Sequence, residues 1–257
     1  MSEIKTISFA NVEKFKEYSA IVLNDFTNDE DEKLYNELIK DDYIMKKCAN
    51  RAKRIKDIKD YVNNLAPEIF HESNKNLNHL YVIDIGPGPG ELLELARHHG
   101  YGHLGFDAPL DDCEMGDKYI KFSHLMAKRQ NINIEYCDFY KKIGNLGLQD
   151  STVVFINSRG SIEQVFRDHL VGVPHKVHKE AKRLAWKIDD DLKDKFRSMF
   201  LEFSRVLVTG GTILIHGNGA SNVNEYNDLI KDTIENIESL VIEASDKERL
   251  HKIRKIN

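Results

Sequence analysis

Three glycines at alternate positions follow a short apolar run and form the most chemically informative segment of the sequence. They are Gly86, Gly88 and Gly90, and Asp84 lies two residues before the first of them. Glycine lets a backbone approach a ligand closely, and a helix beginning at Glu91 would direct unpaired N–H groups toward a carboxylate or phosphate. The segment therefore predicts a ligand-binding turn between a buried strand and a helix.

The spacing of these glycines distinguishes between kinds of nucleotide site. A dinucleotide-binding turn has the pattern G-x-G-x-x-G, whereas here the third glycine comes one residue earlier, and no Gly-Lys-Ser/Thr follows for a Walker-type site. The run Y-V-I-D-I-G-P-G-P-G instead resembles the first motif of the class I S-adenosylmethionine-dependent methyltransferases. The resemblance implies S-adenosyl-L-methionine as the cofactor, S-adenosyl-L-homocysteine as the product, and Asp84, Gly86, Gly88 and Gly90 as cofactor-binding residues.

Further motifs extend the resemblance over roughly residues 78–257. Asp107 ends the run Gly-Phe-Asp, where this family binds the ribose hydroxyls, and Asp138 with Phe139 is similar to its adenine-recognition pair. The segment 205–211, R-V-L-V-T-G-G, is similar to the run that leads into the family's fifth strand. Ligands of open parallel sheets lie beyond the carboxyl ends of the strands, so Asn157 is expected beside these residues in the cofactor site.

Polar residues at the ends of the fourth and fifth expected strands are candidates for catalysis: Asn157, Arg159 and His216. His216 could accept the proton of a methyl acceptor, and a structural role bonded to backbone fits it equally. Arg159 suits bidentate recognition of a carboxylate or phosphate, or is a solvated loop residue. Asn157 stands where metal-dependent catechol O-methyltransferases use aspartate, so no metal is expected.

Short apolar runs alternate with segments of helical period from about residue 80 onward. The expected strands are 80–85, 103–106, 132–136, 153–156, 212–215, 240–244 and 250–256. The pattern predicts an α/β fold, a Rossmann-like, mostly parallel seven-stranded sheet with helices on both faces and an antiparallel last strand. An apolar stripe from Leu184 to Phe203 predicts a helix that ends at Gly210-Gly211.

The first 77 residues show only helical periodicity and are expected to form a helical cap over the substrate. Thr27 and Glu30 have capping-box spacing, which predicts the start of a helix. Residues 78–257 form the expected cofactor-binding domain, within which residues 161–200 are longer than a simple crossover and predict a lid-like insertion.

The composition further narrows the possible classes of protein. The 257 residues carry a formal net charge of −5, so nucleic-acid binding would need a local basic patch. No apolar run reaches the roughly 20 residues of a membrane helix, and the N-terminus lacks signal-peptide character, which together favour the cytoplasm. The three cysteines, Cys48, Cys113 and Cys137, have no zinc-ligand or paired spacing.

The sequence thus predicts a methyltransferase that acts on an O or N atom of a small molecule, with no membrane association. Two alternatives stay open. One is methylation of protein or RNA, with the Lys/Arg-rich residues 46–59 as the docking surface. The other is a non-catalytic binding protein that retains the fold. The acceptor and the oligomeric state are not determined by these patterns.

Overall fold

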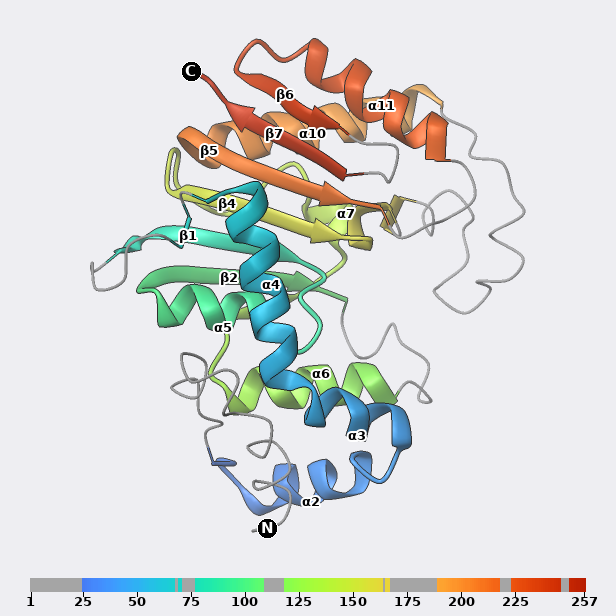
Figure 1. Ribbon diagram of the computed structural model, residues 1–257. Helices are drawn as coiled ribbons and strands as arrows, with labels where there is room; N and C mark the ends of the chain where they lie inside the picture. Colours follow the sequence, from blue (N-terminus) through green and yellow to red (C-terminus); the bar gives the residue numbers. More distant parts are fainter. Residues whose placement is uncertain are drawn as a thin grey trace.

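Figure 1 shows the computed structural model of the chain. The structure describes residues 25–67, 69–70, 77–108, 118–163, 165–166, 189–217, 223–245 and 250–257. Among these residues, no helix combines the length and the apolar character needed to cross a bilayer.

A seven-stranded sheet in the order β3-β2-β1-β4-β5-β7-β6 forms the centre of the molecule. Only the pairings of β7 with β5 and β6 are antiparallel. The arrowheads of β1, β2, β4 and β5 therefore point to the same side in Figure 1. The strands are β1 (Leu77–Ile85), β2 (Tyr101–Asp107), β3 (Ile134–Tyr136), β4 (Val153–Arg159), β5 (Leu207–His216), β6 (Leu240–Ser245) and β7 (Leu250–Lys255). The predicted fold, including the antiparallel last strand, is confirmed.

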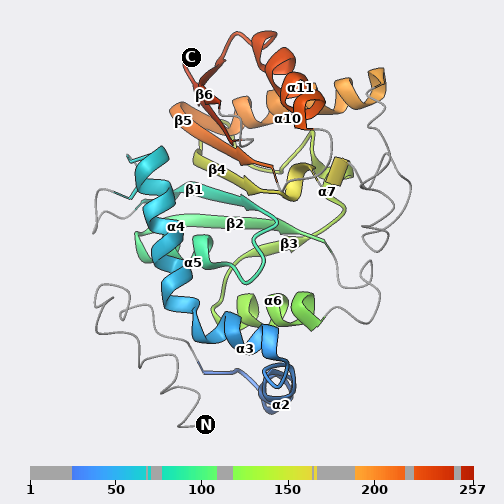
Figure 2. The ribbon, with the colours of Figure 1, turned by 45° about the vertical axis from the view of Figure 1, so that its right-hand side comes forward.

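Helices cover both faces of the sheet, as Figures 1 and 2 show. On one face, α4 and α5 share an apolar cluster with Val82, Phe155 and Leu214. On the other face, α7, α10 and α11 pack in a larger cluster with Ile83, Ile156 and Ile213. The helices are α2 (Asp29–Leu38), α3 (Asp42–Ala49), α4 (Arg51–Leu65), α5 (Glu91–His98), α6 (Lys118–Arg129), α7 (Phe139–Lys142), α10 (Asp190–Val206) and α11 (Val223–Glu235).

The N-terminal helices pack against the helices of the sheet domain. Tyr35, Leu38 and Ile44 of α2 and α3 share a cluster with Phe122 and other residues of α6. Ion pairs at the rim of this contact join Lys128 to Asp31 and Lys118 to Asp41 (2.6 and 3.4 Å). The described part of this segment therefore lies on the α5–α6 face of the sheet.

Two predicted helix boundaries are wrong. The cap of α2 is Asn28, whose side-chain oxygen accepts from the Asp31 amide at 2.8 Å, so the capping residue is one position after Thr27. The helix expected to end at Gly210-Gly211 ends at Val206, and Gly210 and Gly211 lie within β5. The preference of Leu207 and Val208 for the central sheet outweighs the helical spacing that would continue the helix.

Part of the predicted insertion at 161–200 falls within described structure. Residues 161–163 and 165–166 are helical, and residues 190–200 form the first part of α10. Residues 167–188 lie outside the described residues, as does Cys113.

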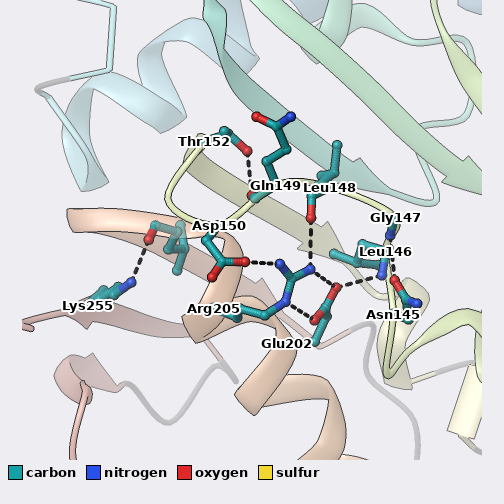
Figure 3. A network of polar contacts seen from close by, with 11 residues as sticks. Asn145, Leu146, Gly147, Leu148, Gln149, Asp150, Thr152, Glu202, Arg205 and Lys255 are labelled. Carbon is teal, nitrogen blue, oxygen red and sulfur yellow. Dashed lines mark hydrogen bonds and ion pairs between the residues drawn. The ribbon is translucent and has the colours of Figure 1, made fainter.

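A polar network fastens the loop before β4 to the end of α10 (Figure 3). Glu202 accepts from the Leu146 amide (2.7 Å) and from Arg205 Nε and Nη2 (2.8 Å each). Arg205 also donates to the Leu148 carbonyl at 2.9 Å and pairs with Asp150. Burial opposes the ionisation of Glu202, but these hydrogen bonds outweigh it and lower the pKa of its carboxyl. The network fixes the entry into β4 at the sheet edge opposite the glycine turn.

We expect Glu202→Gln to lower the free energy of unfolding by about 1–3 kcal/mol, because the amide presents an N–H group to donors that the buried carboxylate now satisfies. Urea unfolding monitored by circular dichroism measures the change. Arg197→Gln on the exposed face of the same helix is the matched control and should change stability by less than about 0.5 kcal/mol. A Glu202→Gln protein as stable as the control would contradict the structural role of the network.

Candidate functional site

The strand order reverses between β1 and β4, and this switch point is where open α/β sheets bind ligands. At their carboxyl ends, β1 leads into the glycine turn, β2 ends at Asp107, and β4 and β5 end at Arg159 and His216. Sequence-predicted residues from separate segments are thus brought to one edge of the sheet.

The strand register places several of these residues on one face. Asp84 pairs with Asn157, and Arg159 pairs with His216. Since Val82, Phe155 and Leu214 face α4 and α5, strand alternation puts Asp84, Asn157, Arg159 and His216 on that same face. Asp107 also lies on this face, because its strand pairs in register with β1.

Asp84 and Asn157 form a buried polar pair across β1 and β4. The Asn157 Nδ2 donates to Asp84 Oδ1 at 2.7 Å. The two residues are 6% and 4% exposed. Burial raises the pKa of Asp84 to about 7, although the hydrogen bond from Asn157 and the charge of Arg159 both lower it. Within the described structure, the buried Oδ1 of Asn157 accepts no hydrogen bond, so an acceptor is available there for a ligand N–H donor.

The glycine turn adopts a backbone conformation that requires glycine. Gly86, Gly88 and Gly90 have φ of 70°, 54° and 83°. A side chain on Gly86 would overlap Ser161, and one on Gly90 would lie 3.3 Å from Ile132. On Gly88 a Cβ would meet only the Tyr119 hydroxyl, at 3.5 Å. Gly88 therefore leaves the backbone of the turn open to a ligand.

Two ion pairs attach α4 to the helix that begins at the turn. Glu91 accepts from Arg54 Nε at 2.8 Å, and Glu94 pairs with Arg51 in a buried contact. Arg54 also donates to the Lys47 carbonyl. Because Arg51 and Arg54 contact α5, these two cations of the basic segment 46–59 do not form an exposed docking face.

Asp107 accepts from the Ala108 amide at 2.9 Å and lies in register with Tyr136 at the end of β3. The Tyr136 ring stacks on His124 of α6 with centroids 3.7 Å apart. Burial, followed by the charge of Asp107, raises the pKa of Tyr136 to about 12. An aromatic pair thus lies beside the carboxylate that the sequence predicts for ribose binding.

The predicted adenine pair is divided between surface and core. The Asp138 side chain is about half exposed and pairs with Lys141 at 3.0 Å. Phe139 is 5% exposed and packs against Phe106, with ring centroids 5.6 Å apart, in the cluster on the α10 face. Asp138 thus lies at the edge of the sheet, whereas the Phe139 ring lies in the core.

Arg159 and His216, two of the residues predicted to act on the methyl acceptor, have different surroundings. The Arg159 guanidinium is exposed and lies over the Tyr61 ring of α4, 5.3 Å from its centroid. His216 is half-buried, and its carbonyl accepts from the Gly160 amide at 2.6 Å. The backbone link places the turn after β4 directly beside the end of β5.

Sequence reasoning missed the aromatic residues at this edge: Tyr61, Tyr119 and Tyr136. The alternation of β3 could have placed Tyr136 on the Asp107 face, given the sheet order. The positions of Tyr61 and Tyr119 depend on how α4 and α6 pack, which no local pattern specifies. No group of three or more His, Cys, Asp or Glu side chains in the described ranges could hold a metal ion.

The strand order with antiparallel β7 is that of the class I S-adenosylmethionine-dependent methyltransferase fold. No family model matches the chain, and no curated protein matches it. Solved structures are similar to the chain at low identity. A protein from Methanococcus maripaludis proposed to be such a methyltransferase is 17% identical, with a TM-score of 0.42, over 80% of this chain and 93% of its own.

Two further structures show the same range of similarity. A SAM-dependent methyltransferase from Aquifex aeolicus is 12% identical, with a TM-score of 0.40, over 79% of this chain and 96% of its own. TrmN from Thermus thermophilus is 13% identical, with a TM-score of 0.41, over 76% of this chain and 48% of its own. The chain thus spans about half the length of TrmN.

The buried Asp84 carboxyl predicts a pH-dependent stability. Its pKa rises from 3.8 in the unfolded chain to about 7 in the fold, so the folded state binds the proton more tightly. The free energy of unfolding should therefore fall as pH rises through this window, with the full penalty present above about pH 7. Asp84→Asn keeps the bond from Asn157, and we expect it to be more stable than wild type at pH 8 by roughly 1–4 kcal/mol.

Urea unfolding at pH 5 and pH 8 tests this expectation, because the stability difference at pH 5 should be less than about half of that at pH 8. Asp138→Asn is the control, since its carboxyl is about half exposed and should change stability little at either pH. A stability difference between Asp84→Asn and wild type that is the same at pH 5 and pH 8 would show that Asp84 does not carry a buried charge.

Proposed function

We propose that the protein is an S-adenosylmethionine-dependent methyltransferase that acts on an O or N atom of a small-molecule acceptor. The observation that carries the proposal is the glycine turn with three left-handed glycines, placed after Asp84 at the switch point of this sheet. Asp107 and Asp138 at the ends of the adjacent strands complete a row of carboxylates for a ligand that carries ribose, adenine and cationic groups.

The described residues fit this ligand. Gly88 leaves room at the turn, and the unsatisfied Oδ1 of Asn157 next to the Asp84 carboxylate suits a ligand ammonium. Asp107 would accept hydrogen bonds from the two ribose hydroxyls. S-adenosylmethionine supplies a sulfonium methyl group that is already activated for in-line displacement.

The chain then has to position the acceptor and keep water away. In this proposal Asn157 and Arg159 at the end of β4 orient the acceptor, and His216 at the end of β5 takes its proton as the new bond to the methyl group forms. The N-terminal segment 1–77 and the segment 161–200 would cover the site. We further propose a cytoplasmic location.

The first experiment measures cofactor binding by isothermal titration with S-adenosylmethionine, S-adenosylhomocysteine and NAD. The two adenosyl ligands should bind wild type, and NAD should not. Asp107→Ala should lower the affinity for both adenosyl ligands roughly tenfold to a hundredfold. The reason is that hydrogen bonds to the carboxylate, which contribute about 1.5–3 kcal/mol, are lost. Asp138→Ala compares the neighbouring carboxylate, with a smaller loss expected from its exposure. Absence of adenosyl binding to wild type would overturn the proposal.

A comparison of two glycine variants distinguishes a loss of ligand contact from the cost of backbone strain. Gly88→Ala and Gly210→Ala both place a side chain at positive φ with little steric contact, so each should lower stability by roughly 1–2 kcal/mol. Only Gly88→Ala should also lower the affinity for S-adenosylhomocysteine by more than about tenfold, because the methyl group of the new alanine occupies the face of the turn. Chemical denaturation and isothermal titration measure the two effects. Equal affinity in both variants would remove the turn from the binding site.

A further inference from the structure

Arg159 places a cation at the carboxyl edge of the sheet with no carboxylate in ion-pair contact among the described residues. Its surroundings differ from those of Arg51 and Arg54 on the same face, which pair with Glu94 and Glu91. The charge of Arg159 acts on Asp84 through space, but Asp84 is bonded to Asn157. The guanidinium therefore has its hydrogen-bonding capacity available at the surface.

The Arg159 guanidinium carbon lies over the Tyr61 ring, 5.3 Å from its centroid. A guanidinium over an aromatic face gains cation–π attraction while its N–H groups remain directed outward in the plane. Those N–H groups form a fork that matches the two oxygens of a carboxylate or phosphate. Since Tyr61 belongs to α4, the packing of α4 on the sheet holds the cation near the end of β4.

Arg159 lies on the β4–β5 side of Asp84. Asp84 and Asp107 end β1 and β2, whereas Arg159 ends β4 and is in register with His216 of β5. A ligand group bound by Arg159 would therefore lie on the β4–β5 side of the glycine turn, next to the histidine proposed to accept a proton.

We propose that Arg159, held over the Tyr61 ring, binds a carboxylate or phosphate group of the methyl acceptor. The inference rests on the proposed function, since it assigns the β4–β5 side to an acceptor. It identifies the substrate class as a small anion with a nucleophilic O or N atom.

Titration of the protein saturated with S-adenosylhomocysteine tests the anion site. The probes are benzoate and phenyl phosphate, with benzamide and benzyl alcohol as neutral counterparts. We expect at least one anion to bind wild type more tightly than its neutral counterpart and to bind Arg159→Gln at least tenfold more weakly. Arg159→Lys should be intermediate, because it keeps the charge and loses the fork. Arg197→Gln, an exposed arginine of α10, should match wild type.

A second arm identifies the source of the anion. S-adenosylhomocysteine and 5′-methylthioadenosine, which lacks the amino-acid carboxylate, are titrated against wild type and Arg159→Gln. Unchanged affinity for both ligands supports the assignment to the acceptor. A loss for S-adenosylhomocysteine alone would assign the carboxylate to the cofactor and overturn the inference.

Two further results would overturn it: equal anion binding by wild type and Arg159→Gln, or no anion binding to wild type at about 10 mM. Failure of wild type to bind either adenosyl ligand would instead overturn the proposed function, so the two failures are distinguishable. Tyr61→Phe should retain anion binding because the ring face is kept, whereas Tyr61→Leu should weaken it.

Discussion

The carboxyl group of Asp84 is buried where β1 meets β4, and its burial opposes ionisation. An asparagine or a hydrophobic residue in its place would spare the fold this cost, since Asn157 supplies only one hydrogen bond to it. The surrounding arrangement partly offsets the cost through Asn157 and the charge of Arg159. In the proposed function, a cationic group of the ligand would stabilise the Asp84 carboxylate directly.

The glycine turn leads directly into α5, and α4 holds that helix in place. Glu91 and Glu94 lie in the first turn of this helix, where the helix dipole favours negative charge. Arg54 and Arg51 of α4 neutralise these carboxylates, so α4 is joined to the turn by ion pairs as well as by the apolar cluster beneath it. Arg54 extends the connection to the Lys47 carbonyl at the end of α3. The N-terminal helices are thus part of the support of the turn.

The sequence was sufficient to predict the sheet, its antiparallel last strand and the helix after the glycine turn, because each has a strong local pattern. The helix predicted to end at Gly210-Gly211 is too long in the prediction, because residues 207–209 fit a helix and a strand alike. Only the pairing of these residues with β4 decides between the two. The cap at Asn28 was missed because Thr27, Asn28 and Asp29 are all acceptable cap residues. The contacts of Arg159 with Tyr61 and of Tyr136 with His124 join segments far apart in the chain, so helix packing rather than spacing determines them.

Charge divides the carboxyl edge of the sheet into two halves. Carboxylates from Asp84, Asp107 and Asp138 lie at the ends of β1, β2 and β3, whereas a guanidinium and an imidazole lie at the ends of β4 and β5. A sulfonium and an ammonium group are attracted to the first half, and an anion to the second. Ligands held in this way would face one another across the switch point, with the methyl group between them. In the proposed function, this division would place a cationic donor beside the carboxylates and an anionic acceptor beside Arg159, because each side would repel the other ligand.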